Sequence, residues 1–132
     1  MSVPARLGVA TLGVADVARA SEFYSSLGWR LSPASVPGVV SWFHTTGGVL
    51  ALVPAADLPE GTPGRPGAAV LTIPVAGPAE VDEALRAAVQ AGASLVRAGG
   101  HRGCFADPDG HLWEITYYPE WPLDGSGVPR LP

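Results

Sequence analysis

An acidic residue inside an apolar strand is the first candidate for chemistry in this sequence. Glu114 lies in "CFADPDGHLWEIT", between Trp113 and Ile115. A carboxylate in such a position needs a proton, a partner or a ligand. The segment "DPDG" at 107–110 predicts a tight turn, because proline presets φ, aspartate bonds its own backbone and glycine accepts a positive φ. The whole stretch therefore predicts a hairpin that carries Glu114 on its second strand.

The histidines are the second candidates, because imidazole binds metals and transfers protons. His111 lies three residues before Glu114, so on one strand the two side chains point to opposite faces. A two- or four-residue loop at "TGG" places Trp42 and His44 on the face of Ala51. His44 and Glu114 then share a face, but two ligands make only a weak metal site. We predict no metal site in this chain.

Composition limits the classes of protein that remain. The chain has 132 residues, 47% of them hydrophobic and 15% charged, which predicts one globular domain over 1–132. The net charge is −4 and the basic residues are scattered, so a nucleic-acid partner is excluded. One cysteine cannot form an intrachain disulfide, and neither a leader nor an apolar run of membrane-spanning length is seen. We expect a cytoplasmic protein without a membrane partner.

The order of predicted elements occurs twice. Each half has a strand, a helix that ends at a glycine, and three further strands; Gly28 comes twelve residues after Asp16, and Gly92 twelve residues after Glu80. The first half covers the segments 7–14, 16–28, 29–33, 39–45 and 49–53, and the second covers 69–75, 78–91, 94–98 and the hairpin. A linker rich in proline and glycine at 54–67 separates modules of about 6–54 and 68–119, and a tail follows at 119–132. The sequence predicts an α+β fold of paired βαβββ modules, forming a concave mixed sheet with the helices on its outer face.

Three segments resemble the vicinal oxygen chelate superfamily of glyoxalases, extradiol dioxygenases and bleomycin-resistance proteins: "LGVADVARASEFYSSLGW", "GVLALVPAADL" and "GCFADPDGHLWEITYYPEWPL". The resemblance runs over about 7–123 and implies four metal-ligand positions, which fall here on Val9, Ala51, Val70 and Glu114. Only Glu114 can bind a metal ion. The resemblance thus favours metal-free members similar to bleomycin-resistance proteins, without a cofactor. It also implies a homodimer in which two chains complete the cavity.

Strand alternation predicts which side chains line that cavity. The predicted wall is mostly apolar, as in pockets for small organic molecules, and consists of Val9, Thr11, Trp42, His44, Ala51, Val53, Val70, Thr72, Phe105, Leu112 and Glu114. Cys104, Trp113 and Ile115 are expected to face the helices.

Three functions remain open for this cavity. The first is binding or sequestering a hydrophobic or aromatic compound, including cationic ones that pair with Glu114. The alternatives are a metal-independent enzyme with Glu114 as general acid or base and, less favoured, a divalent-metal lyase or dioxygenase. In a purely structural interpretation Glu114 is hydrogen-bonded to Thr72 or Thr11.

Overall fold

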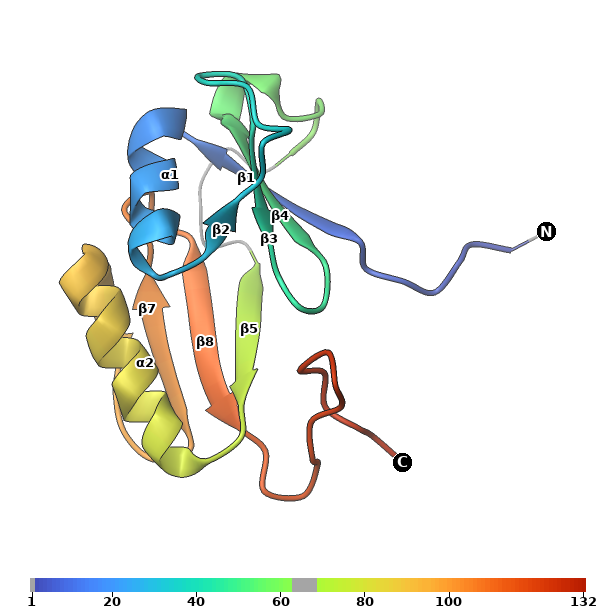
Figure 1. The fold of residues 1–132 in the computed structure, drawn as a ribbon, viewed down its shortest axis with the longest axis vertical. Helices are drawn as coiled ribbons and strands as arrows, with labels where there is room; N and C mark the ends of the chain where they lie inside the picture. The colour runs from blue at the N-terminus through green and yellow to red at the C-terminus, as the bar shows by residue number, and fades with distance from the viewer. Residues whose placement is uncertain (1, 63–68) are drawn as a thin grey trace.

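The computed structural model describes residues 2–62 and 69–132, which form two similar modules (Figure 1). The first consists of β1 (Val9–Val14), α1 (Val17–Ser26), β2 (Arg30–Leu31), β3 (Ser41–His44), β4 (Val49–Pro54) and the short 3-10 helix η1 (Ala55–Asp57). The second consists of β5 (Val70–Val75), α2 (Pro78–Ala91), β6 (Ser94–Arg97), β7 (Arg102–Ala106) and β8 (Leu112–Tyr117). The predicted α+β fold of two βαβββ modules is confirmed. Residues 63–67 of the predicted linker lie outside the described residues.

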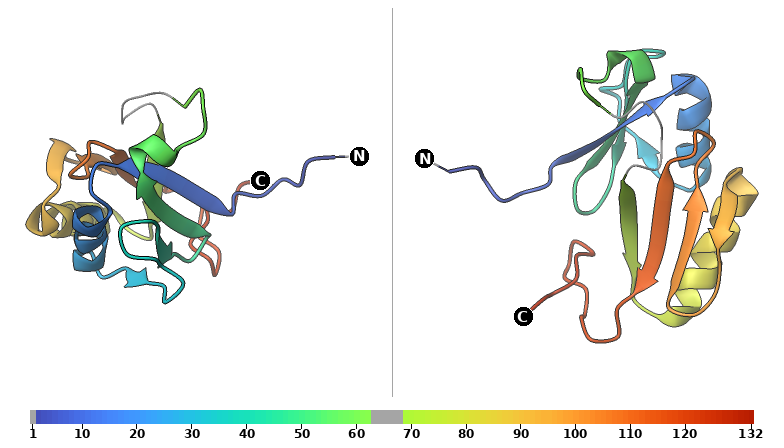
Figure 2. Two further views of the ribbon diagram at one scale, coloured as in Figure 1. Left: turned by 90° about the horizontal axis from the view of Figure 1, so that it is seen from above. Right: turned by 180° about the vertical axis from the view of Figure 1, so that it is seen from behind.

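Each module forms its own four-stranded mixed sheet, with the orders β1-β4-β3-β2 and β5-β8-β7-β6. The first strand of each module pairs in parallel with the last one, β1 with β4 and β5 with β8, and the other pairs are antiparallel. Both helices lie on one side of the molecule, and both ends of the chain leave from the other side (Figures 1 and 2). Each sheet therefore has a face packed on helices and an open face.

The helix ends follow the sequence signals. The Asp16 side chain accepts a hydrogen bond of 3.1 Å from the backbone N–H of Arg19 and so caps α1. Gly28, just past α1, and Gly92, just past α2, have φ values of 91° and 117°, which only glycine adopts without strain. Neither α1 nor α2, nor any other helix of the described residues, is long and apolar enough to cross a membrane.

The two modules share one hydrophobic core. Phe23 and Tyr24 of α1 and Phe43 of β3 are buried together with Phe105 of β7 and Trp113 of β8. The Tyr24 ring lies 5.9 Å from the Phe43 ring of its own module and 6.0 Å from the Trp113 ring of the other module. Burying a large apolar side chain contributes about 1.5–3 kcal/mol, so packing between the modules stabilises both sheets.

A buried hydrogen-bond chain crosses the boundary between the modules. Asp107 accepts hydrogen bonds of 3.0 and 2.8 Å at Oδ1 from the backbone N–H groups of Asp109 and His111, which shapes the turn. Its other oxygen, Oδ2, accepts the hydroxyl of Tyr24 at 2.6 Å, and Trp113 Nε1 donates to the same hydroxyl at 3.0 Å. One carboxylate thus forms the turn and holds the first helix.

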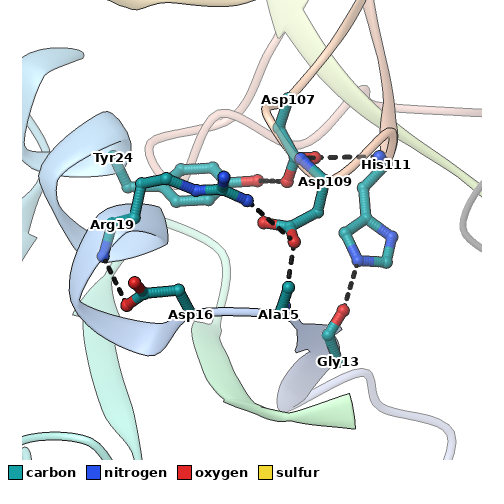
Figure 3. A network of polar contacts seen from close by, with 8 residues as sticks. All are labelled: Gly13, Ala15, Asp16, Arg19, Tyr24, Asp107, Asp109 and His111. Atoms are coloured by element: carbon teal, nitrogen blue, oxygen red, sulfur yellow. Dashed lines mark hydrogen bonds and ion pairs between the residues drawn. The ribbon is translucent and has the colours of Figure 1, made fainter.

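The same turn bonds to the backbone between β1 and α1 (Figure 3). Asp109 Oδ1 accepts the N–H of Ala15 at 2.9 Å and lies 3.6 Å from Arg19 Nη2. His111 Nε2 lies 2.7 Å from the carbonyl oxygen of Gly13, and because a carbonyl only accepts, this nitrogen carries the proton. We call these contacts the module junction, made by Gly13, Ala15, Arg19, Tyr24, Asp107, Asp109, His111 and Trp113.

We expect Tyr24→Phe to lower the free energy of unfolding by about 1–3 kcal/mol, because the buried Asp107 Oδ2 and Trp113 Nε1 then lose their shared partner. Urea denaturation of wild type and variant measures this. Tyr118→Phe, in the partly exposed tail, is the matched control and should change stability by less than about 0.5 kcal/mol. Equal losses in both variants would contradict a structural role for the junction.

The pH profile gives a second readout of the same substitution. Burial raises the pKa of the Tyr24 phenol, and the neighbouring Asp107 carboxylate raises it further. The folded state then holds this proton more tightly than the unfolded state, so the contribution to stability is complete below about pH 10 and is lost as the pH rises above it. Above that pH, wild type should lose roughly 1.4 kcal/mol per pH unit more than Tyr24→Phe. Parallel profiles would contradict this assignment.

Candidate functional site

The open face of the first sheet gathers all six predicted wall residues of that module. Trp42 on β3 pairs with Ala51 on β4, and Ala51 is aligned with Thr11 on β1. Paired residues of neighbouring strands point to one face, and so do residues two apart on one strand. The structure therefore places six of the expected side chains on this open face: Val9, Thr11, Trp42, His44, Ala51 and Val53.

A shallow hollow of about 290 Å³ lies on this face. It is lined by Val9, Ser32, Ala34, Trp42, Phe43, His44 and Val49. The indole of Trp42 is half-buried in it, while His44 is exposed at its rim. The lining is mainly apolar, and of the predicted residues only Val9, Trp42 and His44 belong to it.

The open face of the second sheet holds Glu114 and three more of the expected residues. Thr72 on β5 is aligned with Glu114 on β8, and Val70 is aligned with Leu112. These four side chains share a face but do not line the hollow at Trp42. The structure thus distributes the predicted site over two sheets.

The expectation that Phe105 shares the face of Glu114 is wrong. Phe105 pairs with Trp113, is 1% exposed and lies in the core, whereas Cys104 pairs with Glu114. The cause is the length of the turn. The N–H of Asp107 bonds to the carbonyl of His111 at 2.9 Å, so the loop has three residues and ends in Gly110 with a φ of 93°. Phe105 would share the face of Glu114 only if the loop had an even number of residues, and the three-residue loop shifts the strand partners by one residue.

Glu114 is surrounded by partners from its own module. Thr116 donates its hydroxyl to Oε1 at 2.8 Å, instead of the expected Thr72 or Thr11. Arg102 Nε lies 3.6 Å from Oε1, and Arg97 Nη2 lies 3.8 Å from Oε2. Both arginines were missed from the sequence. Only the correct loop length would have placed Arg102 on this face, since it pairs with Thr116.

The thiol next to Glu114 is not set up as a nucleophile. Burial raises the pKa of the Cys104 thiol, the Glu114 carboxylate raises it further, and Arg97 opposes these two effects. The reactive form of cysteine is the thiolate, so a raised pKa keeps this group inactive near neutral pH.

The donor set of this face does not fit a divalent metal ion. Three of the four family positions carry the alkyl side chains of Val9, Ala51 and Val70, and the fourth, Glu114, already faces two guanidinium groups. Over residues 2–62 and 69–132, no group of three or more His, Cys, Asp or Glu side chains could hold a metal ion. A divalent ion needs several such ligands.

Two βαβββ modules with helices on one side and an open sheet face on the other are the architecture of the vicinal oxygen chelate fold. The chain belongs to the glyoxalase/bleomycin resistance protein/dioxygenase superfamily, whose family model matches residues 6–115.

Solved structures agree with this assignment. A glyoxalase-related enzyme from Fulvimarina pelagi is 32% identical, with a TM-score of 0.82 over 97% of this chain and 99% of that chain. TioX from Micromonospora sp. ML1 is 24% identical, with a TM-score of 0.64 over 83% and 96% of the two chains. A lactoylglutathione lyase from Agrobacterium tumefaciens is 20% identical, with a TM-score of 0.66 over 87% and 95%. The last two show the fold alone. A search of the curated proteins finds no match.

We expect purified protein to hold no stoichiometric nickel, zinc, iron or manganese, because one arginine-paired carboxylate is not a metal site. Elemental analysis before and after treatment with a chelator measures this, and the melting temperature should not change on chelation. The prediction is contradicted if the protein holds one equivalent of a divalent metal and if removing it with the chelator lowers the melting temperature.

Proposed function

We propose that the protein binds a small hydrophobic or aromatic compound on the open face of its first sheet, without a metal ion. The observation that carries this proposal is the apolar hollow beside Trp42. Aromatic side chains at the wall of such a hollow offer a large contact area and defined stacking geometries. The polar groups of Ser32 and His44 at the same wall supply hydrogen bonds that orient the compound.

The size of the hollow limits the compound. Its volume of about 290 Å³ lies at the lower end of the range for small-molecule pockets. A compound of one or two rings fits such a space, and a large multi-ring drug does not fit without a second wall.

The contacts of Glu114 argue against two of the alternatives from the sequence. A cationic ligand would have to displace Arg97 or Arg102 from the carboxylate. A general acid or base needs a free oxygen within reach of the substrate, whereas Oε1 already accepts the Thr116 hydroxyl and both oxygens face guanidinium groups. Binding is therefore favoured over catalysis by Glu114.

A second copy of the chain is proposed to supply the missing wall. Val9 on β1 and Val70 on β5 are more than half exposed, although both sit on edge strands of apolar sequence. Leu7, in the arm that precedes β1, is 95% exposed, and this arm leaves the body of the molecule (Figure 2). Exposed apolar side chains favour burial against another surface. A homodimer buries them and encloses the hollow.

Ligand binding is tested with a thermal-shift screen of neutral one- and two-ring aromatic compounds. A compound at about 100 times its dissociation constant should add roughly 2.7 kcal/mol to stability. We expect Trp42→Leu to lower the affinity for such compounds by about tenfold or more, because the stacking surface is lost. Trp121→Leu, in the tail and outside the hollow, is the control. Hits that bind both variants equally well would refute the proposed position of the site.

The homodimer is tested by light scattering. We expect a particle of twice the 13.5 kDa mass of the chain. Val70→Glu should shift the equilibrium toward monomer, because it places a charge among the exposed apolar residues of the open side. Val89→Glu on α2 is the matched control, since Val89 is 45% exposed against 51% for Val70. A monomeric wild type contradicts the proposal, and equal dissociation of both variants contradicts the surface chosen.

A further inference from the structure

Two arginines and one glutamate share the open face of the second sheet. Arg97 on β6 pairs with Cys104 on β7, which pairs in turn with Glu114 on β8. Arg102 lies two residues before Cys104 and therefore points to the same face. We call Arg97, Arg102 and Glu114 the arginine cluster. It belongs to the second sheet, whereas the hollow at Trp42 belongs to the first.

The charges in the arginine cluster do not balance. Two guanidinium groups face one carboxylate, which leaves one excess positive charge. The N···O distances of 3.6 and 3.8 Å exceed those of a charge-assisted hydrogen bond, so neither arginine uses its donors fully on Glu114. The side chains of Arg97 and Arg102 are 62% and 56% exposed, whereas that of Glu114 is 20% exposed. The carboxylate lies beneath, and the unused N–H donors face the solvent.

Apolar side chains adjoin the arginine cluster on the same face. Val70 on β5 is aligned with Leu112 on β8, which pairs with Ala106 on β7. This row lies two residues along the strands from the row of Glu114 and Cys104, which is about 7 Å. Arg102 lies on the far side of Glu114, but both guanidinium groups reach this carboxylate, so they lie about one such step from this apolar row.

We propose that this face is a second binding site, which takes a small organic carboxylate. The carboxylate group accepts hydrogen bonds from Arg97 and Arg102, and its aryl or alkyl body covers Leu112 and Ala106 of the adjoining row. The planar fork of a guanidinium matches a carboxylate geometrically, which a point charge does not. Glu114 holds the two like charges together from below and contacts no part of the ligand. A cationic compound meets the two exposed guanidinium groups first and is repelled.

The test compares three probes of one shape: 1-naphthoate, 1-naphthalenemethanol and 1-naphthylmethylamine. Isothermal titration of the full-length protein at low salt measures each dissociation constant. We expect the carboxylate to bind about tenfold or more tightly than the alcohol, and the amine to bind most weakly. Added salt should weaken binding of the carboxylate and leave binding of the alcohol unchanged.

Variants assign the preference to the arginine cluster. Arg97→Gln combined with Arg102→Gln should remove the preference for the carboxylate, while Arg86→Gln combined with Arg130→Gln removes the same charge elsewhere and should keep it. Arg102→Lys, which keeps the charge but loses the fork, should lower affinity for the carboxylate. The Trp42→Leu variant should retain carboxylate binding, since Trp42 lies on the other sheet.

The outcomes separate this inference from the proposed function. Equal binding of the carboxylate and the alcohol, or a preference that survives loss of both arginines, overturns the carboxylate site and leaves the site at Trp42 standing. Carboxylate binding that disappears in Trp42→Leu but not in the arginine variant overturns it as well. Amine binding that is lost in Glu114→Gln would show a cation site instead. If neutral compounds fail to bind while binding of the carboxylate depends on the arginines, only the proposed function is contradicted.

Discussion

The carboxylate of Asp107 is the contact on which the arrangement of the two modules depends. One oxygen accepts the backbone N–H groups that close the turn between β7 and β8, and the other accepts the hydroxyl of Tyr24 from the first module. The turn is therefore shaped by the same group that docks it. Asp109 and His111, which that shape points toward the first module, bond to the backbone before α1. A buried carboxylate is stabilised only when its lone pairs are occupied, and here the occupants come from both modules.

The same turn also decides which side chains reach the open face. Its three-residue loop brings Cys104 opposite Glu114 and puts Phe105 opposite Trp113, in the shared core. A loop one residue shorter or longer would exchange these faces, because side chains alternate along a strand. The conformation of this one turn therefore determines both the contacts of the module junction and the side chains on the open face of the second sheet.

Much of the fold could be predicted from the sequence because it rests on local signals. Asp16 marks the start of α1 because its side chain caps the helix, and Gly28 and Gly92 mark the helix ends because they have no side chain. Strand alternation predicted that Trp42 and Ala51 share a face. Other features depend on contacts between distant residues. The sequence places Tyr24 on the apolar side of α1, but its bond to Asp107 spans 83 positions. Arg97 reaches Glu114 past an irregularity of β6 between Leu95 and Arg97, which no periodic pattern reveals.

Glu114 keeps a positive partner in this chain, but the partner has a different chemistry. The family resemblance implies that in metal-dependent members the equivalent position is one of four ligands to a divalent ion, and such an ion is a Lewis acid. Here the positive charge comes from two guanidinium groups, which donate hydrogen bonds in fixed directions and accept no electron pair. Guanidinium groups can recognise and orient an oxyanion through hydrogen bonds, but they cannot coordinate it as a metal ion does. Two guanidinium groups beside Glu114 thus retain an attraction for negative oxygen, which is the basis of the proposed carboxylate site.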